Sequence, residues 1–177
     1  MVYPDPSSIG RVSELARIGA LRAAAAFALV LGREMRAGEP RPRAAAGAWA
    51  RDDAETGVIF EMQGSVPGLI ALLLPRSVCE SAVAALCSET DVSSAAGESA
   101  LREVGNIVAS QAVSAVADHL GGCITLSVPT LVGERGGLIF GQLLAERRAG
   151  RAGLVTESEL CESGQRRALL LFAPDAQ

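Results

Sequence analysis

Three polar residues lie on one face of a helical stretch that is otherwise small and apolar. In "ESALREVGNIVASQ" (98–111), Ser99, Glu103 and Asn106 recur at i, i+4 and i+7, and Ser110 extends the same line. A carboxylate and a carboxamide in this arrangement supply neither a nucleophile nor an efficient general base. They can grip a cation and orient a water molecule, which is the positioning on which phosphoryl transfer largely depends.

A solvated helix face is the alternative interpretation of this polar line, because Glu and Ser are common on surfaces. Two features weigh against it. The line is sparse, whereas solvated helices usually carry many charged residues. The flanking Gly105, Ala109 and Ala112 are small, so that another backbone or a partner could approach closely.

The segments around this stretch predict an α/β protein. Apolar residues recur at helical spacing over about 8–36 and 93–119, and Ser93 or Ser94 can cap the second of these helices. Residues 40–57 are expected to form a polar connection, and 136–150 fits either a helix or a strand. The remaining predictions are a shorter helix at 76–89 and strands at 57–64, 68–75, 123–129, 152–160 and 167–174.

An internal repeat relates the two long helices. At an offset of 89 residues Glu14 falls on Glu103 and Pro40 on Pro129, so that 25 residues lie between the Glu and the Pro in both halves. We therefore predict one domain over 1–177, built from two pseudo-symmetric helix–strand repeats (about 7–89 and 90–177). The two long helices would lie side by side on a mainly antiparallel sheet.

The spacing Ser99-x3-Glu103-x2-Asn106-x22-Pro129 resembles a known signature, Ser/Asp-x3-Glu-x2-Asn-x22-Pro. It is that of the CheC/CheX/FliY family of chemotaxis response-regulator phosphatases, and within the family the chain looks most like CheC. The first half, "ELARIGALRAAAAFAL", is similar to the family's other helix, which typically reads Glu-Leu-x-Asn-Ile-Gly followed by alanines. Together the two repeats cover nearly the entire chain.

The resemblance implies a phosphatase that removes the aspartyl phosphate of a CheY-like response regulator. Glu103 would pair with the active-site lysine of the regulator, and Asn106 would orient the attacking water. Pro129 would shape the chain beside the helix, and Ser99 would occupy the less decisive first position. The regulator supplies Mg²⁺ and the phosphorylated Asp, so the resemblance implies no metal or cofactor of the protein's own.

The first half departs from this pattern at the position of the Asn. Glu14 is kept, but Arg17 stands where the second half has Asn106, and Gly10 stands where it has Ser99. A guanidinium has no acceptor with which to hold a water proton. We therefore expect one working site in the second half and a degenerate first site, where Arg17 could form a weak ion pair with Glu14.

A non-catalytic role is the competing interpretation. Proteins that resemble CheC also associate with the receptor deamidase CheD, and a degenerate first half would suit a regulatory binding module for CheD or for a receiver domain. A dephosphorylation assay beside a binding assay with CheD separates the two functions.

Composition narrows the remaining possibilities. A formal net charge of −4 and a pI near 5.1 give no reason to expect nucleic acid as a partner. No signal peptide is recognisable and no apolar run reaches the length of a membrane span, so we expect no membrane insertion and a cytoplasmic location.

Other residues that often carry chemistry are expected to be structural here. One histidine and four cysteines without a CxxC pair make no metal-binding set. His119 is expected to face the negative end of the second long helix, Trp49 to anchor a linker, and "AERRAGR" (145–151) to be solvated. The cysteines are expected to be small buried hydrophobes in a reducing compartment: Cys79, Cys87, Cys123 and Cys161.

Overall fold

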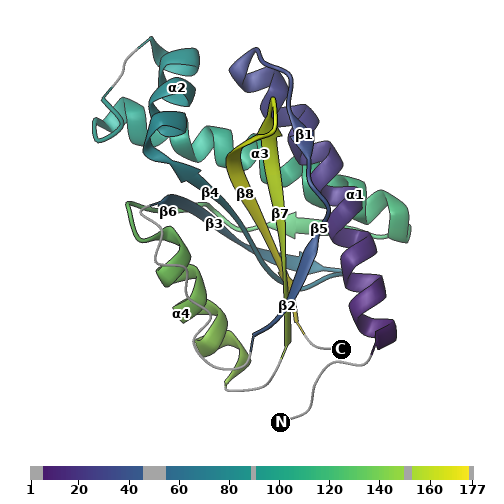
Figure 1. Ribbon diagram of the computed structural model, residues 1–177. Coiled ribbons are helices and arrows are strands. Elements are labelled where there is room, and N and C mark those ends of the chain that lie inside the picture. Colours follow the sequence, from purple (N-terminus) through teal and green to yellow (C-terminus); the bar gives the residue numbers. More distant parts are fainter. Residues whose placement is uncertain (1–5, 46–54, 89–90, 150–152, 176–177) are drawn as a thin grey trace.

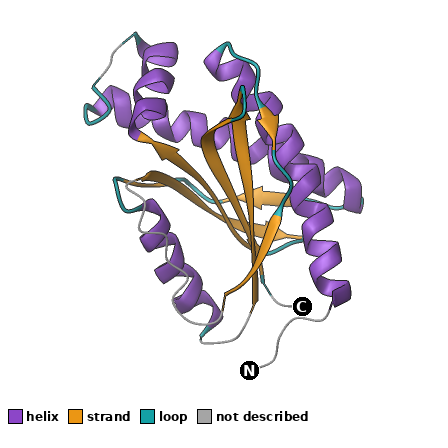
Figure 2. Ribbon diagram, viewed as in Figure 1, coloured by secondary structure: helices purple, strands orange, loops and turns teal. Residues whose placement is uncertain are grey.

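The structure is a computed structural model, and it describes residues 6–45, 55–88, 91–149 and 153–175. Figures 1 and 2 show one sheet with helices packed against it. The helices are α1 (Pro6–Leu31), α2 (Arg76–Cys87), α3 (Ala95–Leu120) and α4 (Gly136–Arg148). The strands are β1 (Arg36–Ala37), β2 (Arg41–Ala45), β3 (Glu55–Gly64), β4 (Gly68–Pro75), β5 (Ile124–Leu126), β6 (Thr130–Val132), β7 (Gly153–Glu162) and β8 (Gln165–Pro174).

The eight described strands form a single antiparallel sheet in the order β1-β7-β8-β4-β3-β5. At its two ends, β2 also pairs with β7 and β6 also pairs with β3, again antiparallel. This architecture confirms the predicted fold class, an α/β domain with a mainly antiparallel sheet.

The sheet has a pseudo-twofold symmetry, because each half places its short strands on the hairpin of the other half. Arg36 pairs with Cys161, and Thr125, which lies 89 residues after Arg36, pairs with Gln63. The two partners, Gln63 and Cys161, are 98 residues apart. The second half is therefore nine residues longer between its short strands and its hairpin, and this longer segment contains α4. At the centre, β4 pairs with β8.

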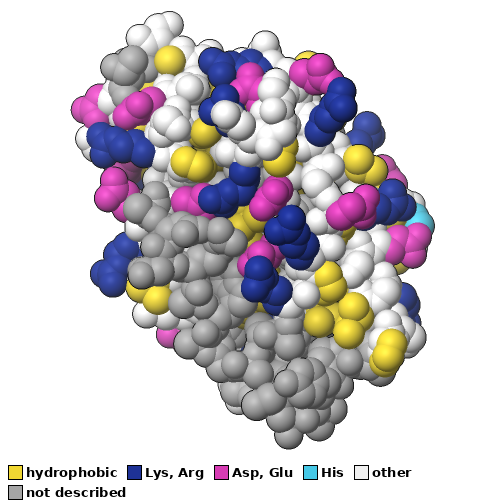
Figure 3. Space-filling view, in the orientation of Figure 1, with side chains coloured by type: hydrophobic (Ala, Val, Ile, Leu, Met, Phe, Trp, Pro, Cys, Tyr) yellow, Lys and Arg dark blue, Asp and Glu magenta, His cyan; other side chains and the backbone are white. Residues whose placement is uncertain are grey.

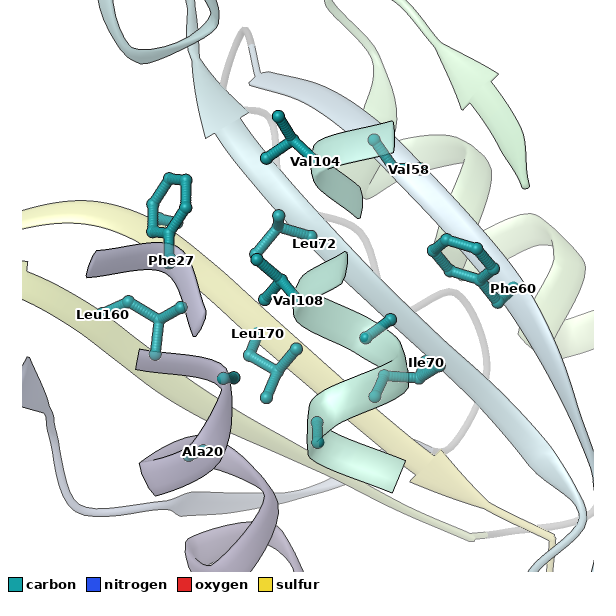
Figure 4. Close-up of a cluster of buried hydrophobic side chains, with 14 of the residues drawn as sticks. Ala20, Phe27, Val58, Phe60, Ile70, Leu72, Val104, Val108, Leu160 and Leu170 are labelled. Atoms are coloured by element: carbon teal, nitrogen blue, oxygen red, sulfur yellow. The ribbon is translucent and has the colours of Figure 1, made fainter. Parts of the chain in front are cut away.

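Helices cover both faces of the sheet. On one face Ile70, Leu72 and Leu74 of β4 lie in the larger core together with buried residues of α1 and α3, as Figure 4 shows for Ala20, Phe27, Val104 and Val108. On the other face the alternate β4 residues pack with two side chains of α4: Leu69, Ala71 and Leu73 with Phe140 and Leu144. A strand buried on both faces reads as a continuous apolar run, as "GLIALLLP" does. Of the segment at 136–150, which the sequence left open between helix and strand, residues Gly136–Arg148 form the helix α4.

Glycine allows two close approaches. A Cβ at Gly105 would collide with the side chain of Val58, so α3 lies directly on β3. A Cβ at Gly19 would lie 3.4 Å from the backbone oxygen of Ala112, where α1 meets α3. Gly105, Ala109 and Ala112 are all buried. Of the two alternatives expected for these small residues, another backbone is therefore confirmed at Ala112, and an external partner was wrong, because the sheet and α1 fill the space.

Several predicted boundaries differ from the observed ones for local reasons. The first helix ends at Leu31, not near residue 36, because Gly32 follows with a φ of +64° and the chain then enters β1. The supposed polar connection at 40–57 contains β2, an edge strand whose alternation Arg41-Pro42-Arg43 reads as loop. Trp49 lies outside the described residues.

The arginine-rich segment at 145–151 was predicted to be a solvated loop or helix end. Its described residues do form the end of α4, but the two arginines there are not simply solvated. Arg148 is buried and donates hydrogen bonds to the backbone oxygens of Leu154 (2.7 Å) and Pro174 (3.2 Å). Arg147 binds the carboxylate of Asp175 at 2.8 Å, and this hydrogen bond raises the pKa of its guanidinium. These contacts attach the end of α4 to the C-terminal strand.

The cysteines follow the expectation only in part. Cys79 is buried, and its burial raises the pKa of the thiol. Cys87 and Cys161 are half-buried, but Cys123 is exposed, so the prediction of four buried thiols was wrong there. Its position explains the exposure, since Cys123 follows the turn that ends α3 and precedes β5. None of the described helices is long and apolar enough to cross a bilayer.

Candidate functional site

The start of α3 is held by a capped turn. The N–H of Gly97 donates to Oγ of Ser94 (3.0 Å), which makes Ser94 the N-cap and settles the choice between the two serines. Ser93 donates its N–H (2.9 Å) and its hydroxyl (2.6 Å) to Oδ1 of Asp91, and these bonds lower the pKa of the Asp91 carboxyl. A fixed start sets which residues of α3 point inward further along.

The phase of α3 turns the predicted polar line outward. Val104, Gly105 and Val108 are buried against the sheet, so Ser99, Glu103 and Asn106 lie on the opposite side and are exposed. Ser110 is half-buried and donates to the backbone oxygen of Ile107 at 3.1 Å. Within the part of the chain that the structure describes, the side chains of Glu103 and Asn106 form no hydrogen bond or ion pair. Both groups are therefore available to a partner.

Pro129 lies in a short bulge between β5 and β6, which both pair with β3. The predicted strand at 123–129 is thus broken: Ser127 donates its N–H to the Glu61 oxygen (2.9 Å), and its Oγ accepts the N–H of Glu61 (2.9 Å). The next two residues leave the ladder. Proline suits this place because it has no N–H to donate.

The register places this bulge close to the level of Gly105 along α3. Gly105 lies against Val58, and Val58 pairs with Leu131, two residues after Pro129. The bulge also turns Val128 outward, with 85% of its surface exposed. Strict alternation in "CITLSVP" would have faced Val128 inward with Ile124, which is why the sequence did not mark it as a surface residue.

The first half presents the corresponding helix face on α1. Gly10, Glu14 and Arg17 are all exposed, as are Ser99, Glu103 and Asn106 at an offset of 89 residues. The suggested ion pair between Glu14 and Arg17 does not form, and neither side chain has a hydrogen-bonding partner among the described residues. Pro40 occupies the same kind of bulge, where Gly38 donates its N–H to the oxygen of Glu159 at 2.7 Å.

Glu103 and Asn106 lie on the exposed outer face of a helix. A cavity of about 10 Å³ between α1 and α3 is lined by apolar residues and Gly19 and does not reach the polar line. Among the described residues no three His, Cys, Asp or Glu side chains converge to hold a metal ion. His119 is exposed in the last turn of α3, more than three turns from Asn106. A surface of this kind can act on a group that a second macromolecule presents.

Comparison with known proteins supports the resemblance found in the sequence. A model described as the CheC-like family matches residues 97–132, the segment that holds the whole Ser99-to-Pro129 spacing. No curated protein matches the sequence at a significant level.

Solved structures share the fold over nearly the whole chain. FliY from Thermotoga maritima is 17% identical, with a TM-score of 0.66, and the match covers 97% of this chain and 92% of that one. A CheX from Desulfovibrio desulfuricans is 14% identical (TM-score 0.64; 90% of this chain, 99% of that one). The Borrelia burgdorferi complex of CheX with CheY, BeF3 and Mg²⁺ contains a chain that is 16% identical (TM-score 0.62; 90% and 96%). The resemblance to the CheC/CheX/FliY proteins is thereby confirmed.

Proposed function

We propose that the chain is a phosphatase that hydrolyses the aspartyl phosphate of a CheY-like receiver domain in chemotaxis. The observation that carries this proposal is the outward face of α3, where Glu103 and Asn106 are exposed and form no internal hydrogen bond or ion pair. This face lies in the segment that matches the CheC-like family model. The known complex of a similarly folded CheX with CheY supports a receiver as the partner.

In this proposal Glu103 anchors the receiver by an ion pair with its active-site lysine. Asn106, one turn further along α3, reaches the phosphorylated aspartate and holds a water in line with the bond that breaks. The water oxygen forms the new bond to phosphorus, and the bond to the aspartyl oxygen breaks. The products are inorganic phosphate and the free carboxylate, while Mg²⁺ is supplied by the receiver.

A carboxamide suits this task for electrostatic reasons. It accepts a hydrogen bond from the water and donates another, and it stays neutral beside the phosphoryl group. A carboxylate in its place would repel that group, and a methyl group could not hold the water. Because an acyl phosphate already hydrolyses readily, positioning one water gives a useful acceleration without a strong base.

The test is dephosphorylation of a phosphorylated CheY receiver in Mg²⁺, measured as release of inorganic phosphate. We expect Asn106→Ala to slow single-turnover hydrolysis by about 100-fold, the cost of losing one well-placed reactant. Gln111→Ala is the matched control, because it removes an exposed carboxamide from another face of α3. Equal rates for the wild type and Asn106→Ala would refute the assigned role.

Glu103→Gln separates anchoring from chemistry. Loss of the carboxylate charge is expected to raise KM for the receiver about tenfold while kcat changes little. The reason is that the ion pair stabilises the bound ground state and the transition state equally. An unchanged KM would remove the anchoring role and leave that of Asn106 intact.

A regulatory binding module for CheD or a receiver domain is the second candidate function. The observation in its favour is α1, whose exposed face keeps Glu14 but has Arg17 where α3 has Asn106. Capture of purified CheD by a chain that fails to dephosphorylate any CheY would favour this function over the first.

A further inference from the structure

The outward face of α1 differs in chemistry from that of α3 although the fold treats the two helices alike. Six exposed or half-buried positions follow one another along each helix at a constant offset of 89 residues. On α3 they are polar: Ser99, Glu103, Asn106, Ser110, Ser114 and Asp118. On α1 they are Gly10, Glu14, Arg17, Leu21, Ala25 and Leu29.

The apolar part of the α1 face is unusually exposed. Leu21 has 51% and Leu29 86% of its surface accessible, and both follow Arg17 along the same side of the helix. Single exposed leucines are common on protein surfaces. Here two of them follow Glu14 and Arg17 along the same helix face, and their counterparts on α3 are the polar residues Ser110 and Asp118. The face therefore has a charged end and an apolar end.

Arg17 also differs from the arginines at the neighbouring sheet edge. There Arg41 and Arg43 of β2 face Glu159 and Glu157 of β7 at 3.8 and 3.1 Å, and Figure 3 shows positive and negative side chains interleaved over that surface. Arg17 and Glu14 have no such neighbours within the described residues. Their charges are thus available to an incoming molecule.

We propose that the α1 face (Glu14, Arg17, Leu21 and Leu29) is a second docking site for the phosphorylated receiver, which binds there without being hydrolysed. The inference rests on the proposed function, because the same partner would meet the same helix geometry. Glu14 is placed as Glu103 is, to pair with the receiver's lysine. Arg17 takes the position at the receiver's phosphorylated aspartate that Asn106 takes on α3. Its guanidinium donates a bidentate pair of hydrogen bonds to phosphoryl or carboxylate oxygens.

Docking at α1 stops before the chemical step because a guanidinium only donates hydrogen bonds. It cannot accept a hydrogen bond from a water and so cannot align that water for attack. Leu21 and Leu29 add apolar contact beyond the charged end, which slows dissociation. One chain would accordingly hold one phosphorylated receiver on α1 while it turns over another on α3.

The experiment measures how many receivers one chain binds. The full chain is titrated by calorimetry with CheY saturated with beryllium fluoride and Mg²⁺, a stable mimic of the phosphorylated form. We expect two receivers per chain for Asn106→Ala and one for the same chain carrying Arg17→Glu as well. Arg22→Glu in the Asn106→Ala background is the matched control, since Arg22 is exposed on a neighbouring face of α1, and the stoichiometry should stay at two.

Two results overturn the proposal in distinguishable ways. A stoichiometry of one for the chain with an intact α1, with normal hydrolysis of phosphorylated CheY by the wild type, removes the second site and leaves the proposed function standing. Neither binding nor hydrolysis by the wild type removes both. Leu29→Asp provides an independent readout: it should speed dissociation from α1 severalfold, and circular dichroism would verify that the chain stays folded.

Discussion

Helices α1 and α3 occupy equivalent places against the sheet, yet only α3 carries the Glu–Asn pair to which we assign hydrolysis. Both contribute their buried side to the same core, and both are followed by two short strands with a proline bulge between them. Their outward sides differ at Asn106 and Arg17. The contrast separates what the fold requires, a small apolar inner face, from what the proposed chemistry requires, one carboxamide.

The most direct way to break the contrast between the two helices is a gain of activity on α1. If Arg17 is what prevents hydrolysis there, Arg17→Asn should restore turnover to a chain already inactivated by Asn106→Ala. We expect the double variant to hydrolyse phosphorylated CheY at least about tenfold faster than Asn106→Ala alone, which corresponds to roughly 1.4 kcal/mol of barrier.

The control for this gain is Arg22→Asn in the same background, which places a carboxamide on a neighbouring exposed position of α1. Phosphate release from both variants is measured with the same receiver. No gain from Arg17→Asn would mean that the two faces differ by more than this side chain, with Gly10 and Leu21 the nearest remaining differences.

Much of this comparison is visible in the sequence, because it depends on helical periodicity and on an offset that is constant along each helix. The exposed face of α3 and the two long helices follow from spacing. The exchange of short strands between halves does not, since β1 and β6 are two and three residues long and carry almost no pattern.

Residues whose role depends on distant contacts were also beyond the sequence. Gly105 was interpreted as leaving room for another backbone or a partner, but what lies against it is the side chain of Val58, 47 positions away in the chain. Arg148 looked solvated, but two backbone oxygens from different strands accept its hydrogen bonds. Both errors have one cause: periodicity tells which side of an element is buried and not what lies against it.

Substitution of one glycine on each helix tests how closely the two helices are packed at those positions. Gly105→Ala adds a methyl group where Val58 leaves no room, so we expect the free energy of unfolding to fall by about 1–3 kcal/mol. Gly10→Ala meets nothing within 4 Å and should raise it by about 0.4–1 kcal/mol, because alanine loses less entropy in a helix. Urea denaturation measures both.

These two variants also link packing to the site. Gly105→Ala pushes α3 away from β3 and should lower phosphatase activity, because Asn106 moves with the helix. Gly10→Ala should leave activity as it is. Equal stability of Gly105→Ala and the wild type would show that β3 and α3 can separate without cost, contrary to the close approach seen here.

The smallest expected effects concern the capped turn that sets the phase of α3. Ser94→Ala removes the oxygen that accepts the Gly97 N–H and should cost about 0.5–2 kcal/mol of stability in the same denaturation experiment. Ser93→Ala acts on Asp91 instead. The variant removes the hydroxyl bond to Oδ1 of Asp91 and keeps the backbone N–H bond, so the Asp91 carboxyl should titrate at a higher pKa, part of the way back to its ordinary value.

The sign of the pH dependence follows from this shift. A carboxyl whose pKa is lower in the folded chain than in the unfolded one stabilises the fold above the unfolded pKa, and this contribution is lost as the pH falls through the folded pKa. Ser93→Ala should therefore shrink the acid-dependent part of the stability and leave neutral-pH hydrolysis by Asn106 unchanged. Carbon-detected NMR titration of Asp91 measures the shift directly. An identical titration in the wild type and the variant would mean that the Ser93 hydroxyl does not bind Asp91 in solution.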